Sequence, residues 1–333
     1  MDSILKNQIN LEKTSPNTYS ISWDVDWSFG TTLHGGCVAA AIHHAAVTHL
    51  TTDPTLVACD QPDVLSLHLE FLRACEQRSS VITIEPLRVG AAASVLQLQL
   101  SQGGRVRVFA LATSTNFDKD LGPTAATAWS LRPPPPPTPD FNRVLAHQPD
   151  ENWLPGVVAG EIIPLTRRKL GLNPRVGCTV DGICDAWHSF LGDERMDATY
   201  LALMADIIPS LSDTLLRNGG LYDNHTLLAQ MEQWAEKHPG LPCMMSNSIA
   251  DALQATYHNV TLTMDIQYKQ RLSEKGQRWI FTRAAAKMLQ GGRMDLEITM
   301  CNEDMKLLAT AQQVILVLGA QNKFRGHKEK SAL

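Results

Sequence analysis

Two distant stretches of the chain carry the same alternation of hydrophobic and polar residues. Residues 96–100 (LQLQL) and 294–298 (MDLEI) alternate strictly, which is typical of β-strands with one buried face. Each is followed by a polar turn and a second strand, and these second strands share the fragments ALAT (110–113) and LLAT (307–310). The offset is 198 residues before the turn (96 to 294) and 197 after it (110 to 307). This long period indicates a duplicated domain of antiparallel β-structure.

The first half predicts one buried helix followed by a run of strands. Residues 37–50 contain no Gly or Pro, are rich in Ala and are apolar on almost every side, which predicts a buried helix. A short strand precedes it, and a series of alternating segments follows it. The expected strands are 19–25, 64–72, 80–89, 94–102 and 105–114. This order is an α+β pattern in which the sheet wraps around the helix.

The second half repeats this order, with one large departure. A helix is expected at about residues 198–207, and strands are expected before and after it. These strands are 157–165, 176–183, 259–268, 278–289, 293–300 and 306–318. Residues 209–258 form an insertion that includes an amphipathic segment, 226–237, and an insertion of this size is expected to be a lid or a packing arm.

A proline-rich segment separates the two halves. Residues 131–140 read LRPPPPPTPD, and five consecutive prolines predict a polyproline II spacer. We therefore expect an N-terminal domain (1–130), a Pro-rich linker (131–145), a C-terminal domain (146–320) carrying the insertion 209–258, and a flexible tail (321–333).

Charge and composition narrow the classes of partner. The 333 residues include 29 basic and 34 acidic side chains, for a net charge of −5, and no basic stripe interleaves with aromatics. Nucleic acid is therefore not an expected partner. No apolar run approaches the ~20 residues that span a bilayer, so no membrane association is expected.

Cysteine usage and the chain ends bear on location and metals. Seven cysteines without a CxxC pair fit a reducing compartment and give no zinc site, so neither a metal nor a cofactor is expected. The first residues lack the apolar core of a secretory signal. The last three residues, Ser331-Ala332-Leu333, resemble the peroxisomal Ser-Lys-Leu signal, but Ala replaces the basic residue. Cytoplasmic residence without disulfides is therefore favoured over the peroxisome.

Several motifs resemble those of one family. Phe29-Gly30 and residues 33–37 (LHGGC), which open the buried helix, resemble the start of the central helix in hotdog-fold thioesterases. Residues 67–73 (LHLEFLR) look like the strand that follows it. Residues 193–206 align without a gap to the helix of bacterial acyl-CoA thioesterase II. The whole chain is similar to fungal thioesterase-like proteins, and the resemblance implies a double hotdog: two tandem α+β domains whose antiparallel sheets each wrap a central helix.

The same resemblance suggests a catalytic set in the second half. Hydrolysis of a thioester needs a base or water-positioning group and donors for the developing oxyanion. Asp206 is the candidate base, and Thr261 and Gln312 fall where the bacterial enzyme carries the Thr and Gln that would hold the attacking water. The family's Asp-His pair is Thr263-Met264 here.

Residues of the first half are candidates for substrate binding. Gly35 and Gly36 permit close backbone approach, and free N–H groups at a helix N-terminus stabilise a negative oxygen. His34 precedes them, and His43 stands where single-hotdog thioesterases carry an acidic residue. The first half is therefore expected to have lost or altered its own catalytic site. The basic candidates for coenzyme A phosphates are Arg73, Arg88, Lys269, Arg271 and Arg293.

Three functions are compatible with these residues. The first is hydrolysis of an acyl thioester, carried by coenzyme A or by an acyl carrier and including polyketide thioesters. The second is a thioesterase-like cyclase or isomerase of fungal natural-product biosynthesis, favoured by the lost Asp-His pair, the insertion and His34, His43 and His44. The third is non-catalytic acyl binding. A homodimer is kept open as the assembly.

Overall fold

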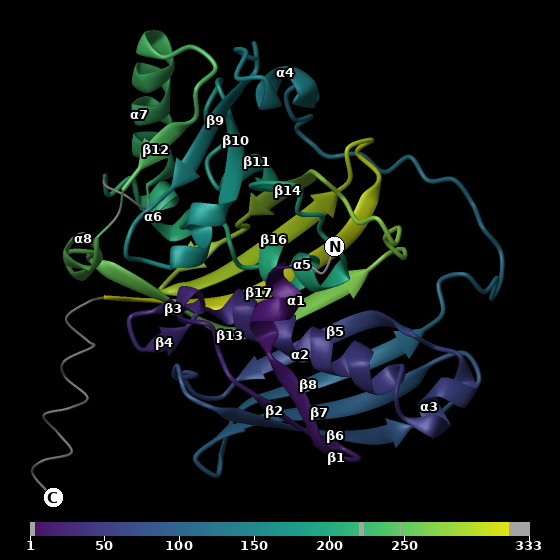
Figure 1. The fold of residues 1–333 in the computed structure, drawn as a ribbon. Coiled ribbons are helices and arrows are strands. Elements are labelled where there is room, and N and C mark those ends of the chain that lie inside the picture. Colours follow the sequence, from purple (N-terminus) through teal and green to yellow (C-terminus); the bar gives the residue numbers. More distant parts are fainter. Residues whose placement is uncertain (1–3, 220–222, 247, 320–333) are drawn as a thin grey trace, which may run out of the picture.

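The structure is a computed structural model that describes residues 4–219, 223–246 and 248–319. Within these ranges one sheet of fifteen strands runs through both halves of the chain, in the order β1-β2-β6-β7-β8-β5-β13-β17-β16-β14-β11-β10-β9-β12, with β15 beside β16 (Figure 1). The two halves meet where β5 pairs antiparallel with β13. This arrangement confirms the predicted double hotdog, because each half contributes its own antiparallel sheet to one continuous surface.

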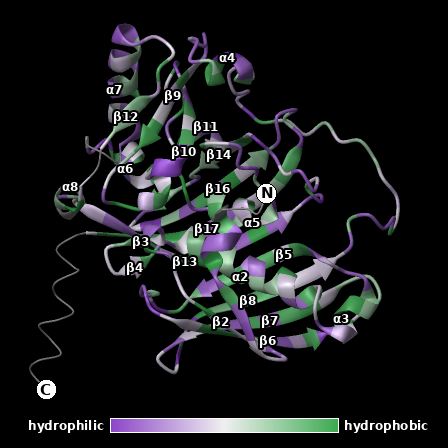
Figure 2. Ribbon diagram, in the orientation of Figure 1, coloured by the Kyte–Doolittle hydropathy of each residue, from purple (hydrophilic) through white to green (hydrophobic). Residues whose placement is uncertain are grey.

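The strands of the two halves have the following bounds. In the first half they are β1 Leu11–Ser15, β2 Thr18–Ile21, β3 Ser28–Phe29, β4 Thr32–Leu33, β5 Asp63–Phe71, β6 Ser80–Arg88, β7 Ser94–Gln102 and β8 Arg105–Thr115. In the second half they are β9 Trp153–Val158, β10 Lys169–Pro174, β11 Ile183–Phe190, β12 Cys243–Met245, β13 Tyr257–Tyr268, β14 Ile280–Ala285, β15 Leu289–Gln290, β16 Arg293–Cys301 and β17 Leu307–Gly319. Figure 2 shows many of these strands striped in hydrophobic and hydrophilic residues, as expected of a sheet with one buried face.

The helices are mostly short. They are α1 Ile4–Ile9, α2 Gly35–Leu50, α3 Pro54–Cys59, α4 Phe141–Leu145, α5 Ala198–Met204, α6 Leu211–Leu216, α7 Asn224–Lys237 and α8 Ile249–Leu253, with 3₁₀ turns η1 Val25–Trp27 and η2 Pro164–Arg168. In the part of the chain that the structure describes, no helix has the length and apolar character needed to cross a bilayer.

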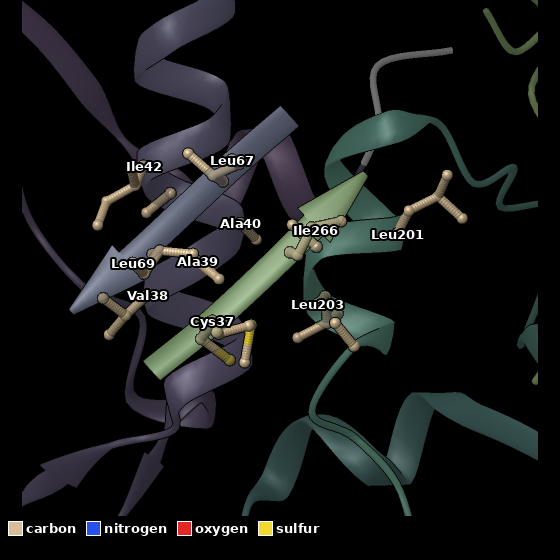
Figure 3. Packing of buried hydrophobic residues seen from close by; sticks show 14 of the residues in the cluster. Cys37, Val38, Ala39, Ala40, Ile42, Leu67, Leu69, Leu201, Leu203 and Ile266 are labelled. Carbon is tan, nitrogen blue, oxygen red and sulfur yellow. The ribbon is translucent and has the colours of Figure 1, made fainter. Parts of the chain in front are cut away.

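The two central helices, α2 and α5, pack against each other and against the sheet. Figure 3 shows Ala39 and Ala40 of α2 facing Leu67 of β5 and Ile266 of β13, with Leu203 of α5 close by. All five of these residues are fully buried. Alanine is a strong helix former, and its small side chain lets a helix lie close to its neighbours. The core therefore joins both halves into one body.

Two of the expected strands are wrong. The expected strand 176–183 falls on the loop 175–182 between β10 and β11, because Gly177 and Gly182 take left-handed φ angles of +73° and +82° that do not continue a strand. Residues 157–165 contain only the end of β9, because Pro164 lacks a backbone N–H and begins η2 instead. The expected helix 198–207 is present as α5 but ends at Met204.

The insertion 209–258 is a packed part of the second half. It contains α6, the expected amphipathic helix as α7, β12 and α8. Leu228 and Met231 of α7 are buried, and Met231 lies in a small cluster with Leu154, Cys243 and Met245. β12 pairs with β9 in parallel, which extends the sheet by one strand. The insertion thus covers the strands β9 and β10 and one end of the sheet.

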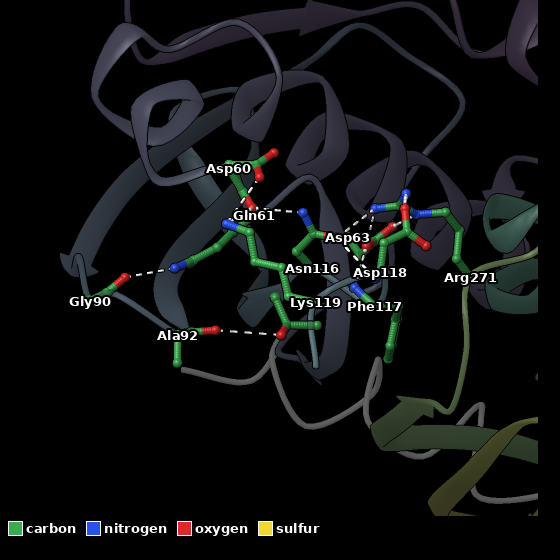
Figure 4. Close-up of polar contacts among 11 residues, drawn as sticks. Asp60, Gln61, Asp63, Gly90, Ala92, Asn116, Phe117, Asp118, Lys119 and Arg271 are labelled. Carbon is green, nitrogen blue, oxygen red and sulfur yellow. Dashed lines mark hydrogen bonds and ion pairs between the residues drawn. The ribbon is translucent and has the colours of Figure 1, made fainter. Parts of the chain in front are cut away.

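A polar contact links the two halves at a second place. The guanidinium of Arg271, just after β13, forms a bidentate pair with Asp63 at 2.8 and 2.6 Å (Figure 4). It also contacts Asp118 and Asn116 of the first half. Planar bidentate pairs of this kind fix geometry as well as adding energy.

The Pro-rich linker is anchored on the second half. The indole Nε1–H of Trp153 donates to the carbonyl of Pro137 at 2.7 Å, and Arg283 donates to the carbonyl of Pro133 at 2.6 Å. The last expected segment, the tail 321–333, lies outside the described residues, as does the C-terminal tripeptide.

Candidate functional site

Asp206 lies just beyond α5, at the junction of the two halves. Its Oδ2 accepts a hydrogen bond of 2.8 Å from the backbone N–H of Gly36, in the first turn of α2. His34, the residue that precedes α2, makes no capping bond with its own side chain. Asp206 therefore caps α2 from the other half of the chain. Helix N-termini favour anions through their free N–H groups and their dipole.

The two glycines at the start of α2 make this contact sterically feasible. A Cβ on Gly35 would lie 2.8 Å from Asp206 Oδ2, and a Cβ on Gly36 would lie 2.6 Å from the carbonyl oxygen of Leu203. Only glycine allows α2 and α5 to approach this closely. The N–H of Gly36 is used by Asp206. The N–H of Gly35, the first residue of the helix, has no acceptor within the described ranges, and Gly35 borders a cavity.

Gln313, and not Gln312, lies beside Asp206. Gln313 is 2% exposed, and its Nε2 donates to the carbonyl of Ala205 at 2.6 Å and lies 3.4 Å from Asp206 Oδ1. Its Oε1 accepts a 2.9 Å hydrogen bond from the hydroxyl of Thr261. Gln312 is exposed on the opposite face of β17. The prediction for Gln312 is thus corrected by one position, whereas Asp206 and Thr261 each contact Gln313 and border the same cavity.

A β-bulge in β13 places Thr261 on the inner face of the sheet. Thr263 pairs with Val314 of β17, but Thr261 pairs with Ile315, so Leu262 is an extra residue in β13. Because side chains alternate along a strand, one extra residue reverses the face on which all preceding residues lie. Thr261 therefore reaches the same face as Gln313.

Two adjoining cavities meet at Asp206 and His34. The interdomain cavity, of about 630 Å³, is lined by residues of both halves, including Gly35, Phe71 and Thr261. The β10 chamber, of about 190 Å³, lies between the insertion and the strands β9, β10 and β11. Asp206 and His34 line both spaces. A ligand whose reactive carbon lies at Asp206 has access to either cavity.

His34 and His43 differ in position. His34 Nε2 lies 3.4 Å from Asp206 Oδ2, and His34 Nδ1 is buried without a hydrogen-bond partner. His43 is 2% exposed; its Nδ1 bonds to Thr199 Oγ1 at 3.2 Å, and its ring packs on Tyr268. Burial lowers the pKa of His43 to about 4. The structure therefore contradicts a substrate contact for His43, which lies in the core between α2 and α5.

Of the basic residues considered for coenzyme A, Arg73 alone lines the interdomain cavity, within the described part of the chain. Arg271 is engaged by Asp63 and Asp118 in the contact that joins the halves. No group of three or more potential metal ligands is present among the residues described.

Lys169 and His188, both in the β10 chamber, were not predicted from the sequence. Lys169 has the appearance of an ordinary surface lysine, and His188 stands in a strand that the sequence pattern did not locate. Gln313 was detectable, because Ile315 and Val317 continue the buried face on which it lies.

Comparison with known proteins agrees with this architecture. Residues 23–116 match the family model of the acyl-CoA thioesterase N-terminal domain, and residues 124–317 match that of the C-terminal domain. A curated relative, the thioesterase-like protein TwmA of Talaromyces wortmannii, is 25% identical over 329 residues, which cover 93% of this chain and 90% of that protein.

Two solved structures are similar in fold. The acyl-CoA thioesterase II TesB2 of Mycobacterium marinum has a TM-score of 0.58 at 20% identity, covering 95% of this chain and 97% of that one. A hot dog fold protein of Alicyclobacillus acidocaldarius has a TM-score of 0.66 at 16% identity, covering 95% and 98%. Since the two family models together match most of the sequence, the chain belongs to the acyl-CoA thioesterase family.

Proposed function

We propose that the protein hydrolyses an acyl thioester, carried by coenzyme A or by an acyl carrier, with Asp206 as the base or water-orienting carboxylate. The observation that carries this proposal is the position of Asp206 at the meeting point of two cavities, with its two carboxylate oxygens held by separate contacts. Oδ2 accepts from Gly36 N–H at 2.8 Å, and Oδ1 lies 3.4 Å from Gln313 Nε2.

The proposed reaction uses these groups as follows. A water between Asp206 and Thr261 gives a proton to the carboxylate as its oxygen attacks the thioester carbon. The carbonyl oxygen becomes an oxyanion, and the N–H of Gly35, which borders the interdomain cavity, is a backbone donor suited to stabilise it. Collapse of the tetrahedral intermediate re-forms the C=O bond and breaks the C–S bond. The thiolate that leaves takes up the proton held by Asp206, which restores the carboxylate and yields a free acid and a thiol.

Gln313 has a positioning role in this scheme. It links the Thr261 hydroxyl, the Ala205 carbonyl and the Asp206 carboxylate, and it is itself 2% exposed. It therefore acts through the two groups that border the interdomain cavity. This assignment replaces the role first given to Gln312.

Hydrolysis is preferred to cyclisation because of where the histidines lie. The cyclase alternative used His34, His43 and His44, and of these only His34 lines either cavity in the part of the chain described. Non-catalytic binding is separated from hydrolysis by the experiment below.

The test is release of free thiol from a panel of acyl-CoA substrates by the wild-type protein and by Asp206→Asn. Asn keeps the size of the side chain and one acceptor for Gly36, so the fold should be preserved. Loss of a positioned base typically lowers the rate by ~10²–10⁴-fold. Asp265→Asn is the matched control, because Asp265 stands in β13 near the junction of the two halves, but its side chain is 45% exposed and contacts His68. Unchanged turnover in Asp206→Asn would rule out the mechanism.

A further inference from the structure

The β10 chamber contains a lysine and a histidine that the proposed hydrolysis does not use. Gly171 and His188 stand directly opposite each other in the pairing of β10 with β11, and Lys169 is two residues before Gly171 on the same face. Lys169 and His188 are therefore diagonal neighbours across the strands, a spacing that long side chains can bridge. Most of the remaining wall is apolar, including Val158, Ile162 and Met245.

His188 lines this chamber, but its unpaired ring nitrogen lies behind the chamber wall and has no surface on the open space. The side chain is 3% exposed, and its Nε2 lies 2.7 Å from Thr282 Oγ1. A neutral ring that accepts the Thr282 hydroxyl proton at Nε2 carries its own proton on Nδ1. This Nδ1 is buried and has no partner in the structure.

Lys169 adds a cation without a counter-charge. Its Nζ donates to the carbonyl of Ile207 at 3.3 Å and pairs with no carboxylate in the part of the chain described. An ammonium has three donors, so two are left over. Burial lowers the pKa of Lys169 to about 7, which reflects the same lack of a negative partner.

We propose that the β10 chamber binds the far end of a short acyl group, and that Lys169 recognises a carboxylate oxygen there. This inference rests on the proposed function and adds the class of substrate. The remaining N–H groups of the Lys169 ammonium are donors, so the ligand supplies acceptors, and a carboxylate also supplies the negative charge that pairs with this ammonium. The amine contacts Ile207, next to Asp206, so the carboxylate lies only a few bonds from the thioester carbon.

The size of the chamber limits the acyl group. An engineered cavity of about 150 Å³ holds a benzene molecule. The β10 chamber, at about 190 Å³, thus has room for a group somewhat larger than benzene, of roughly six to eight heavy atoms. Glutaryl, with a terminal carboxylate, and hexanoyl, which ends in a methyl group, are of this size and form a matched pair of probes.

The test is the affinity of glutaryl-CoA, hexanoyl-CoA and coenzyme A, measured by calorimetry on Asp206→Asn protein so that turnover does not interfere. We expect glutaryl-CoA to bind at least tenfold more tightly than hexanoyl-CoA. Adding Lys169→Met should lower the affinity for glutaryl-CoA about tenfold and change the affinity for hexanoyl-CoA by less than twofold. Lys275→Met is the matched control, because Lys275 is exposed and lies outside both cavities.

A second variant tests the location of the acyl group without altering charge. A Cβ on Gly171 would have no neighbour closer than 3.7 Å, so Gly171→Val fits the strand and narrows the chamber. It should weaken both acyl-CoA ligands at least fivefold and leave coenzyme A unchanged. Unchanged acyl affinities in this variant, equal binding of the two acyl ligands, or equal weakening of all three ligands by Lys169→Met would overturn the proposal.

These outcomes are independent of hydrolysis. If the wild-type protein releases no thiol but the preference for glutaryl-CoA depends on Lys169, the proposed hydrolysis is wrong and the proposed ligand of the β10 chamber is supported. If hexanoyl-CoA is hydrolysed and glutaryl-CoA does not bind more tightly, the proposed ligand of the chamber is wrong and the proposed hydrolysis is supported.

Discussion

Replacing Gln313 with Met should lower turnover, whereas the same change at Gln312 should not. Gln313 is 2% exposed and connects Thr261, the Ala205 carbonyl and Asp206, whereas Gln312 is exposed on the other face of β17. Met fills a similar volume without hydrogen-bonding groups. The Asp206 carboxylate then loses the contact at Oδ1 and keeps the contacts of Oδ2 with Gly36 N–H and His34 Nε2.

The magnitude follows from the bonds that are lost. Loss of a single preorganised donor typically costs ~10²–10³ in kcat. Because Gln313 acts on the base and not directly on the ligand, we expect the lower end, roughly a 10²-fold decrease in kcat with KM within threefold. Leaving the Ala205 carbonyl and the Thr261 hydroxyl unpaired should also lower stability by about 1–3 kcal/mol.

The assay is steady-state thiol release together with thermal unfolding of both variants. A structural defect alone would lower the melting temperature and the fraction of active protein but would leave kcat per folded molecule unchanged, so active-site titration separates the two cases. The reasoning is refuted if Gln313→Met is folded and retains more than half of the wild-type kcat, or if Gln312→Met loses as much.

Two further predictions concern the packing behind the site. Burial holds the pKa of His43 at about 4, below its ordinary value of 6.5, so the unfolded chain takes up the proton first and stability falls as the pH drops from 6.5 to 4. His43→Phe should reduce the dependence of the unfolding free energy on pH by about 1.4 kcal/mol per pH unit, as measured by denaturant titrations at pH 5 and 6. An unchanged pH dependence would contradict a buried, neutral His43. Gly36→Ala places a Cβ 2.6 Å from the Leu203 carbonyl oxygen and should destabilise by roughly 1–3 kcal/mol and impair thiol release. Gly122→Ala, which would meet nothing within 4 Å, is its control, and equal melting temperatures for the two variants would show that close approach of the helices is not required.

The fold could be predicted because its main patterns occur twice in the duplicated sequence. The alternation in 96–100 and 294–298 and the Ala-rich segment that forms α2 define strands and a buried helix without knowledge of the tertiary structure. The strands and turns within residues 157–190 could not be predicted correctly. Its strands β9, β10 and β11 are separated by a loop and by η2, and the turn residues Gly177 and Gly182 were counted within a strand.

The candidate site was only partly predictable, for a reason that lies in strand register. Counting back from the buried residues Met264 and Ile266, simple alternation places Thr261 on the outer face. The bulge at Leu262 reverses this, and nothing in the local sequence signals it. For Gln312 and Gln313 the alternation alone was sufficient, since Ile315 and Val317 are buried and share a face with Gln313.

The position of Asp206 explains why this site requires both halves of the chain. Asp206 follows the C-terminus of α5, where the helix dipole disfavours an anion by about 0.3–1 kcal/mol. A charge-assisted hydrogen bond, such as that from Gly36 N–H at 2.8 Å, contributes about 1.5–3 kcal/mol, and the N-terminus of α2 adds a favourable dipole. The contact across the halves therefore outweighs the unfavourable local one. The first half thus supplies the cap that holds the carboxylate in place. This cap also explains why Gly35 and Gly36 stand at the start of α2, because Asp206 can reach the helix N-terminus only if α2 and α5 are in close contact.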